Sequence, residues 1–214
     1  MIILENMREN KLNKCELNSL QGFIKRSFDL LMSSIALFFL SPLLFFFWVL
    51  SSLQLRENGF FIQQRVGRNA KLFNVYKLKT MKPLNGYNTT VTSSDDPRIT
   101  TLGSFLRKYK IDELPQLFNV VIGDMSLVGP RPDVSGFADK LIKEQKAILS
   151  LRPGITGPAS LKYKDEELLL ANEKDPEAYN RYVIWPDKVD INLKYIANWS
   201  FLNDLKLIIR TVVG

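Results

Sequence analysis

Between Leu30 and Leu55 the sequence reads LLMSSIALFFLSPLLFFFWVLSSLQL, and no charged residue interrupts this stretch. As one straight helix, at about 1.5 Å per residue, the segment would reach roughly 39 Å, which exceeds the roughly 30 Å hydrocarbon core of a bilayer. It starts too far from the N-terminus, is too long for a signal peptide, and no small-residue cleavage pattern follows it. The segment therefore predicts a helix that enters a membrane.

Ser41 and Pro42 lie near the middle of this segment. Proline removes one intrahelical hydrogen bond and clashes with the preceding turn, so we expect a break here, with the Ser41 hydroxyl bonding a carbonyl group that Pro42 leaves free. Each arm would measure about 18 Å, too short to cross a bilayer alone.

Basic residues flank the apolar segment on both sides, which favours a re-entrant hairpin whose two ends face the cytoplasm. These residues are Lys25, Arg26, Arg56, Arg65, Arg68 and Lys71. A kinked helix that crosses the membrane, or a buried helix of a soluble protein, remains as an alternative.

The composition narrows the chemistry. The chain has 29 Lys and Arg against 22 Asp and Glu, a net charge of +7, one cysteine and no histidine. A Ser-His-Asp triad, a Cys-His dyad and a His-ligated zinc site are excluded, and the single Cys15 excludes an intrachain disulfide. The positive charge favours an anionic partner, which is nucleic acid, acidic lipid or a phosphorylated small molecule.

The expected organisation is a polar leader at residues 1–20, a re-entrant membrane hairpin at 21–57, and a cytoplasmic catalytic domain with interfacial amphipathic helices at 58–214. In this last part the β-rich runs 60–64 and 72–77 predict a hairpin around Gly67, Arg68 and Asn69. We expect an α+β fold that is mostly helical. A loop is expected at 83–97 and helical segments at 102–109, 112–121, 136–150, 165–183 and 193–213.

Asp112 and Glu113 are adjacent acids at the start of a helical pattern. Such carboxylates usually cap a helix, but the chain also supplies nearby arginines whose planar forks suit phosphate oxygens. A carboxylate that faces phosphates needs an intervening cation, for which Mg²⁺ is the usual solution. The arginines are Arg98, Arg107, Arg131 and Arg152.

Other phosphate-binding patterns are missing from the sequence. The glycines at positions 123, 129, 154 and 157 form neither a GxGxxG motif nor a P-loop. No nucleic-acid-binding motif accompanies the basic charge, and the apolar segment calls for lipid, so we expect no nucleic-acid partner.

From about residue 22 to its C-terminus, the chain resembles the bacterial sugar transferase family of small monotopic phosphoglycosyl transferases. The central stretch, from Asp96 to Pro132, is the most specific part of the resemblance. Four stretches carry it: KRSFDLLMSSIALFFLSPLL, QQRVGRNAKLFNVYKLKTM, DPRITTLGSFLRKYKIDELPQLFNVVIGDMSLVGPRP and RPGITGPASLKY.

The resemblance implies an enzyme on the cytoplasmic face of the bacterial inner membrane. It would move a sugar-1-phosphate from a UDP-sugar to polyprenyl (undecaprenyl) phosphate, release UMP and initiate surface glycan synthesis. Asp112 would be the nucleophile that forms a covalent phosphosugar intermediate and would also bind Mg²⁺, while Glu113 would orient or deprotonate a reacting group. The family's Ser-Pro break of the re-entrant helix corresponds to Ser41 and Pro42.

The candidate phosphate-binding residues are Arg107 and Arg131, with Lys77 and Lys79 behind them. Lys164 lies where a phosphate-gripping arginine is found in many relatives, and Asn192 lies where some relatives place aspartate, so sugar preference could depend on either. The alternative function is a non-catalytic basic adaptor on the membrane surface, although an adaptor needs no Asp-Glu pair flanked by arginines. The sequence leaves a homodimer open.

Overall fold

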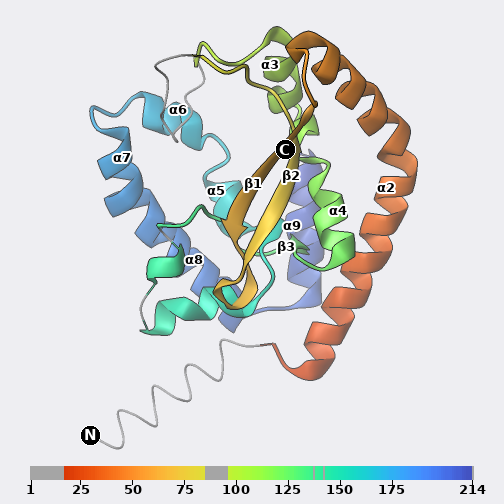
Figure 1. Ribbon diagram of the computed structural model, residues 1–214. Coiled ribbons are helices and arrows are strands. Elements are labelled where there is room, and N and C mark those ends of the chain that lie inside the picture. Colours follow the sequence, from red (N-terminus) through yellow and green to blue (C-terminus); the bar gives the residue numbers. More distant parts are fainter. Residues whose placement is uncertain (1–16, 85–95, 137, 142, 214) are drawn as a thin grey trace, which may run out of the picture.

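A computed structural model of the chain describes residues 17–84, 96–136, 138–141 and 143–213. Most of the predicted polar leader, with Cys15, and most of the predicted loop at 83–97 lie outside these residues. The described chain is mostly helical and has two small two-stranded sheets (Figure 1). The expected α+β class with a dominant helical content is confirmed.

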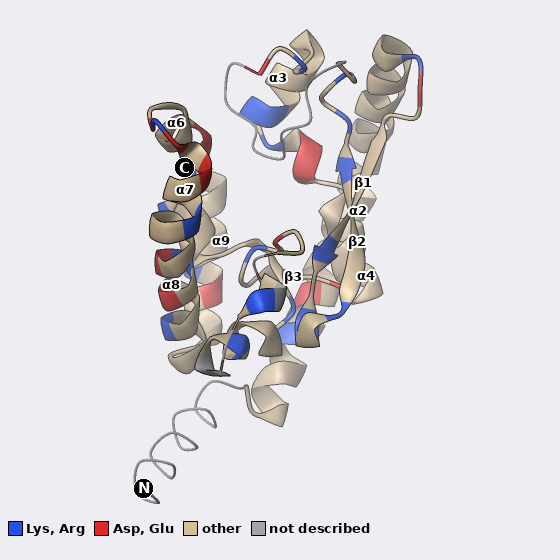
Figure 2. Ribbon diagram, turned by 60° about the vertical axis from the view of Figure 1, so that its left-hand side comes forward, with Lys and Arg blue, Asp and Glu red and all other residues tan. Residues whose placement is uncertain are grey.

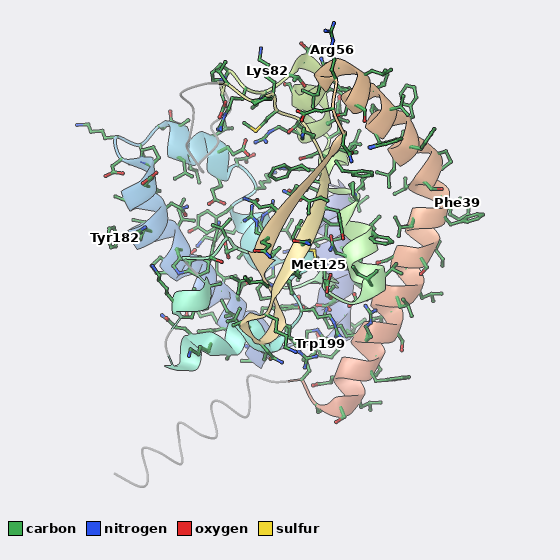
Figure 3. All side chains as sticks on the ribbon, viewed as in Figure 1. Phe39, Arg56, Lys82, Met125, Tyr182 and Trp199 are labelled. Carbon is green, nitrogen blue, oxygen red and sulfur yellow. The ribbon has the colours of Figure 1, made fainter. Side chains whose placement is uncertain are left out.

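The apolar segment lies within one long helix, α2 (Ser19–Leu55), of 37 residues. Asn18 and Gln21 form a capping box at its start, and Arg56 ends it in a left-handed conformation with φ 55°. Figure 2 shows most of α2 free of charged residues. Its apolar side chains lie largely outside the protein core, as Phe39 does, pointing away from the molecule in Figure 3.

The predicted break at Ser41 and Pro42 does not interrupt the helix, because α2 continues through Pro42. Proline cannot donate to the carbonyl four residues earlier, which is that of Phe38. The Ser41 hydroxyl donates to this same carbonyl at 3.0 Å. The expected role of Ser41 is therefore confirmed, and it helps to explain how the helix tolerates the proline. A re-entrant course through the membrane stays a prediction.

The predicted hairpin is present. Strands β1 (Phe60–Val66) and β2 (Leu72–Leu78) pair antiparallel, with Phe61 opposite Lys77. The turn between them contains the 3₁₀ segment η1 (Arg68–Ala70), where Asn69 adopts φ 56°, a conformation that asparagine tolerates better than most residues. The register of the hairpin thus fixes the position of Lys77 along β2, opposite Phe61 of β1.

The centre of the chain packs against α2 and the hairpin. Helix α4 contacts both α2 and β2, and the short strand β3 pairs in parallel with β4. Here the backbones approach so closely that a Cβ on Gly154 would lie 2.1 Å from the Gly129 nitrogen. The elements are α3 (Thr101–Lys108), η2 (Ile111–Glu113), α4 (Gln116–Ile122), β3 (Ser126–Val128) and β4 (Gly154–Thr156).

The predicted helix at 136–150 is wrong, because the described chain there forms two 3₁₀ segments. Leu141 and Ile148 are nevertheless buried, as expected. The predicted helix at 193–213 is divided by the turn at 198–200. The C-terminal elements are η3 (Ala138–Lys140), η4 (Lys143–Ser150), α5 (Pro158–Lys162), α6 (Glu166–Ala171), α7 (Pro176–Tyr179), the π-helical η5 (Asn180–Ile184), α8 (Trp185–Ala197) and α9 (Phe201–Val213).

One part of the hydrophobic core includes the long apolar helix α2. Phe47 of α2 forms a buried cluster with Leu78 at the end of β2 and Leu106 of α3. Burying such a side chain contributes about 1.5–3 kcal/mol relative to leaving it in water. Helix α2 therefore supports the segments that lead to Asp112.

Candidate functional site

Asp112 and Glu113 lie on the 3₁₀ turn η2, which joins α3 to α4. Lys110 adopts a left-handed conformation with φ 55° just before this turn, so the chain changes direction immediately ahead of the two acids. Pro115 then precedes the first residue of α4. The two carboxylates are thus held between two helices, and both are largely buried, with Asp112 7% exposed.

Glu113 is bound by two basic side chains from distant parts of the chain. The Lys77 amine lies 2.9 Å from its Oε1, and the Arg131 guanidinium lies 2.5 Å from Oε1 and 3.3 Å from Oε2. Figure 2 shows the acidic segment below α3 beside a basic segment of β2. Burial alone would raise the pKa of Glu113, but the charges of Arg131 and Lys77 hold that pKa well below its usual range. Glu113 is therefore an ionised anchor for both cations.

Asp112 has the opposite environment. Burial, and next the neighbouring charge of Glu113, raises the pKa of Asp112 to about 6, although Lys77 and Arg107 oppose the shift. Its Oδ1 is buried and has no hydrogen-bond partner among the described residues. Two adjacent carboxylates with pKa values pushed apart are suited to different tasks. A desolvated carboxylate oxygen without a partner is available to a ligand.

Asn119 positions Lys77, and sequence reasoning missed it. This side chain is fully buried on α4; its Oδ1 accepts the Tyr76 N–H at 3.1 Å and its Nδ2 donates to the Asn74 carbonyl at 2.7 Å. The amide therefore binds β2 to the helix that follows the dyad. A polar residue inside the apolar run LFNVVI was the signal that could have found it.

Two further residues that the sequence did not single out for the site, Arg65 and Asp133, lie next to Arg131. Arg65 of β1 donates to the Pro132 carbonyl at 3.3 Å, and the Val66 N–H donates to the Asp133 carbonyl at 2.9 Å. Burial raises the pKa of Asp133 to about 6. The strand β1 thus holds the loop that carries Arg131 against the dyad.

The other predicted phosphate-binding residues, Arg107, Lys79 and Lys164, make no hydrogen bond or ion pair with Asp112 or Glu113 within the described chain. Arg107 forms an ion pair with Glu167 at 2.5 Å, and its charge still lowers the pKa of Asp112. Lys79 pairs with Glu57 at 3.0 Å rather than with the dyad. Lys164 is exposed, and among the described residues the structure shows no contact between it and either acid. The geometry thus brings Lys77 and Arg131 onto Glu113 and leaves Lys79 and Lys164 away from it.

The loop arginines that the sequence grouped with the acids separate in the structure. Arg98 pairs with Asp96 at 2.6 Å. Arg152 donates through Nε to the Gly123 carbonyl at 2.7 Å, at the end of α4. Of the four loop and helix arginines considered, Arg131 is the one that contacts the dyad within the described chain.

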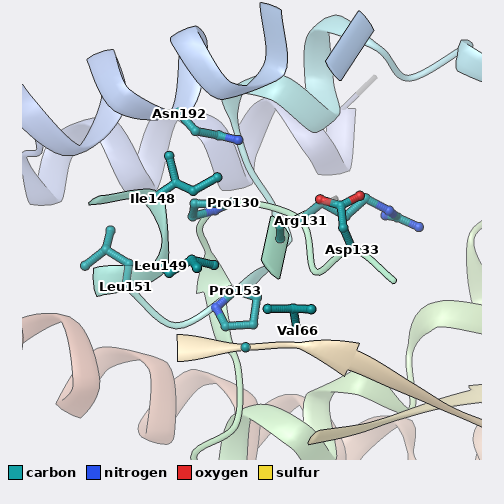
Figure 4. Close-up of a pocket in the computed structure, with 11 residues that line it drawn as sticks. Val66, Pro130, Arg131, Asp133, Ile148, Leu149, Leu151, Pro153 and Asn192 are labelled. Carbon is teal, nitrogen blue, oxygen red and sulfur yellow. The ribbon is translucent and has the colours of Figure 1, made fainter. Parts of the chain in front are cut away.

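Asn192 is buried on α8 and lines a small pocket with Arg131 and Asp133 (Figure 4). The pocket measures about 20 Å³, which is room for about one water molecule. The Asn192 Oδ1 has no hydrogen-bond partner within the described part of the chain. The pocket is too small for a sugar, so this geometry does not present Asn192 to a sugar ring.

The dyad fits a magnesium ion that is shared with a substrate. Among the described residues, no group of three acidic, histidine or cysteine side chains could form a metal site made entirely of protein ligands. Mg²⁺ commonly binds through one or two carboxylates together with substrate phosphates. The unpartnered Oδ1 of Asp112 meets that requirement, whereas both oxygens of Glu113 are already bound.

Comparisons with known proteins cover nearly the whole chain. Residues 20–214 match the family model described as Bacterial sugar transferase. "Exopolysaccharide production protein ExoY" of Sinorhizobium fredii is 33% identical over 210 residues, which are 89% of this chain and 84% of that protein.

Two longer relatives carry more specific names. "Undecaprenyl-phosphate galactose phosphotransferase" of Salmonella typhimurium is 33% identical over 207 residues, which are 88% of this chain and 40% of that protein. "UDP-N-acetylgalactosamine-undecaprenyl-phosphate N-acetylgalactosaminephosphotransferase" of Aeromonas hydrophila is 32% identical over 213 residues, 98% of this chain and 47% of that protein. The chain spans less than half the length of these two relatives.

Proposed function

This chain belongs to the bacterial sugar transferase family, and we propose that it moves a sugar-1-phosphate from a UDP-sugar to undecaprenyl phosphate, with release of UMP. The product, a polyprenyl-diphosphate-linked sugar, would begin a surface glycan. The observation that carries the proposal is the pairing of a desolvated, unpartnered Asp112 with a Glu113 that Lys77 and Arg131 neutralise.

The reaction proceeds in two displacements. An Asp112 carboxylate oxygen attacks the sugar-bearing phosphorus of the UDP-sugar, the bond from that phosphorus to the UMP oxygen breaks, and UMP leaves. An oxygen of the lipid phosphate then attacks the same phosphorus and breaks its bond to Asp112, which returns as a free carboxylate. One small site can therefore serve a soluble donor and a lipid acceptor in turn.

The basic side chains supply charge where the phosphates accumulate it. Arg131 is about half exposed, so its guanidinium can reach a substrate while it holds Glu113. Lys77 is less exposed and shares Glu113 Oε1, and the Arg107 charge acts on Asp112 from α3. In phosphoryl transfer, positioning and charge neutralisation of this kind supply most of the rate enhancement.

The contacts of Glu113 favour an orienting role over proton transfer. A general base works best with a pKa near the operating pH, and the cations hold the pKa of Glu113 well below its usual range although burial opposes them. Since both of its oxygens are already bound, Glu113 fixes the directions of Lys77 and Arg131 toward the substrate.

Asp112 would hold Mg²⁺ together with substrate phosphate oxygens. The bound ion would neutralise phosphate charge and so reduce its repulsion of the carboxylate. Asp112 is suited to this because it has a buried oxygen to which no described residue donates.

Helix α2 would anchor the enzyme as a re-entrant element, with both ends on the cytoplasmic face of the inner membrane. The support is its apolar surface, which is largely unburied, and the basic residues before and after it. Such an anchor would hold the dyad close to the level at which the lipid phosphate lies.

The test is a screen of UDP-sugars for UMP release by the purified chain with Mg²⁺ and undecaprenyl phosphate. We expect release with at least one donor, and a phosphosugar adduct on Asp112 detectable by mass spectrometry when the acceptor is omitted. Turnover without any adduct would replace the covalent route by direct transfer in a ternary complex. No release with any UDP-sugar would contradict the proposed donor class.

A further inference from the structure

A second cluster of basic side chains surrounds a cavity at the start of α2. The cavity measures about 290 Å³, and its lining includes Lys25 and Arg26 of α2, Arg68 of the hairpin turn, and Arg152 of the loop before β4. In Figure 2, basic segments gather where the hairpin turn meets the first part of α2. Three separate parts of the chain therefore bring these charges together.

This cluster is separate from the candidate active site. The hairpin runs from the pair Phe61 and Lys77 to the pair Val66 and Leu72 before it turns at Arg68. At about 3.4 Å per residue, this stretch measures roughly 17 Å along the strands. The cavity thus lies at the opposite end of the hairpin from the Lys77 amine that binds Glu113.

Backbone carbonyl groups fix the directions of the arginines. Arg26 donates to the carbonyls of Val120 and Val121 at 2.6 and 3.0 Å, where α4 ends. Arg152 donates through Nε to a carbonyl at the same helix end, and Arg68 uses its Nε for the Ser150 carbonyl at 2.8 Å. For the terminal nitrogens of Arg68 and Arg152, the described residues provide no further hydrogen-bond acceptor.

Within the described chain, ion pairs balance only part of the positive charge of this cluster. Lys25 is neutralised by Asp204 at 2.6 Å, and Asp29, which also lines the cavity, accepts the Leu127 N–H. Within the described chain no carboxylate lies at ion-pair distance from the three arginines of the lining. Burial, together with the charges of Arg26 and Arg68, lowers the pKa of Arg152, although the charges of Asp29 and Asp124 oppose the shift.

Holding three guanidinium groups around one cavity costs free energy through their mutual repulsion. Capping the end of α4 accounts for the positions of Arg26 and Arg152, but Arg68 contributes nothing to that end. A bound anion would offset the repulsion, and arginine forks match phosphate oxygens especially well.

We propose that this cavity binds a phosphate group that takes no part in the transfer reaction. Its place at the membrane surface rests on the proposed anchor, since the start of α2 would then lie at headgroup level. The phosphate could belong to the headgroup of an anionic phospholipid or be free in solution. Both sources offer anionic oxygens on a tetrahedral phosphorus to Arg68 and Arg152.

The test uses the purified full chain in phosphatidylcholine nanodiscs and follows its thermal unfolding. One arm adds inorganic phosphate, with chloride at the same ionic strength as the reference. The other arm replaces part of the phosphatidylcholine by phosphatidylglycerol. The variants are Arg68→Gln, whose side chain is exposed, and Arg152→Gln; the matched control is Lys71→Gln, which removes a nearby exposed charge outside the cavity lining.

We expect the unfolding temperature of the wild type and of Lys71→Gln to rise in at least one arm, because a ligand that binds the folded state stabilises it. Arg68→Gln should weaken the apparent affinity roughly tenfold, as the loss of one charged hydrogen bond predicts. A rise with inorganic phosphate identifies free phosphate as a sufficient ligand, and a rise with phosphatidylglycerol alone identifies the lipid headgroup.

The proposal is overturned if neither arm stabilises the wild type, or if Lys71→Gln weakens the effect as much as Arg68→Gln does. UMP release by Arg68→Gln, measured in detergent with the acceptor supplied, should equal that of the wild type. That assay reports on the transferase separately. If the wild-type protein binds phosphate but releases no UMP, the proposed transfer reaction is contradicted and the proposed phosphate site is not.

Discussion

Arg131 holds both carboxylate oxygens of Glu113, with its two terminal nitrogens at 2.5 and 3.3 Å. Lysine keeps the charge but cannot form this fork. We expect Arg131→Lys to lower kcat/KM for UMP release by roughly tenfold to a hundredfold, the equivalent of one charge-assisted hydrogen bond. Arg56→Lys, at the exposed end of α2, is the matched control and should leave kcat/KM unchanged. Equal activity of Arg131→Lys and the wild type would show that the fork has no catalytic role.

Asp112→Asn should abolish UMP release, with a loss of roughly a thousandfold or more, because an amide cannot attack phosphorus as a carboxylate does. The variant should still partition into membranes, since α2 is unchanged. Asp190→Asn on the exposed face of α8 removes the same charge and should retain full activity. Full turnover by Asp112→Asn would assign the nucleophile to another group.

The same substitution should stabilise the protein. Burial raises the pKa of Asp112 to about 6 from its ordinary 3.8, so the ionised form is disfavoured in the folded state. At neutral pH, keeping Asp112 ionised in the folded state therefore costs roughly 2–3 kcal/mol of the free energy of unfolding, and an uncharged amide avoids this cost. Thermal unfolding in magnesium-free detergent solution measures this, and an Asp112→Asn variant less stable than the wild type would contradict it.

The stability of magnesium-free protein should depend on pH through Asp112 and Asp133, whose pKa values burial raises to about 6. A folded-state pKa above the unfolded value means that the folded state binds the proton more tightly. The stabilisation is therefore complete below the unfolded value of 3.8 and is lost as pH rises through about 6. The unfolding temperature should therefore fall as the pH rises from about 4 to about 6. Burial also raises the pKa of Asp29, so the variant with Asp112 and Asp133 changed to asparagine should show a smaller fall, and an unchanged fall would exclude these two groups as its source.

Asn119→Leu should destabilise the protein by about 3 kcal/mol, because it leaves the Tyr76 N–H and the Asn74 carbonyl without partners. It should also lower UMP release, since Lys77 follows Tyr76 on the released strand. Asn172→Leu at an exposed position near the end of α6 is the control. The measurement is the unfolding temperature of each variant, which should be lower for Asn119→Leu than for Asn172→Leu. Equal unfolding temperatures would exclude the proposed link between α4 and β2.

Ser41 and Pro42 should be energetically coupled. Ser41→Ala removes the hydroxyl that serves the Phe38 carbonyl, and we expect a loss of about 1 kcal/mol when Pro42 is present. In a Pro42→Ala background the restored N–H can serve that carbonyl, so the serine should become dispensable. A double-mutant cycle of thermal unfolding measures the coupling, and additive effects would contradict it.

The course of α2 through the membrane has its own test. After Cys15→Ser, the substitutions Leu20→Cys and Arg56→Cys place thiols at exposed positions beside its two ends. A re-entrant helix should leave both open to an impermeant reagent from the cytoplasmic side, whereas Pro42→Ala should favour a full span. Labelling of the two wild-type positions from opposite sides would refute the re-entrant anchor.

The hairpin, the apolar helix and the dyad were predictable because each depends on local signals. Residues 67–69 carry a turn pattern, and adjacent Asp112 and Glu113 stand out at the start of a helical pattern. The partners of the dyad depend on tertiary packing. From the sequence, Arg131 and not Arg98 was a phosphate-binding candidate, but the sequence could not show that Arg131 reaches Glu113 while Arg98 pairs with its near neighbour Asp96.

Two expectations from the sequence differ from the structure, and each difference has a physical reason. Pro42 was expected to break the helix, but α2 continues through it. The Ser41 hydroxyl donates to the Phe38 carbonyl, to which Pro42 cannot donate. The segment 136–150 has helical periodicity but forms 3₁₀ turns, in which Leu141 and Ile148 still reach the core. Periodicity predicts which side chains turn inward better than it predicts the backbone that brings them there.

The burial of Phe47 with Leu78 and Leu106 also bears on how the protein can be handled. Truncation before Gly59 would remove one wall of that cluster and uncover apolar surface that no other described element covers. A fragment of the transferase that lacks α2 is therefore expected to precipitate, and purification of the intact chain with this apolar helix is the sound route to homogeneous material.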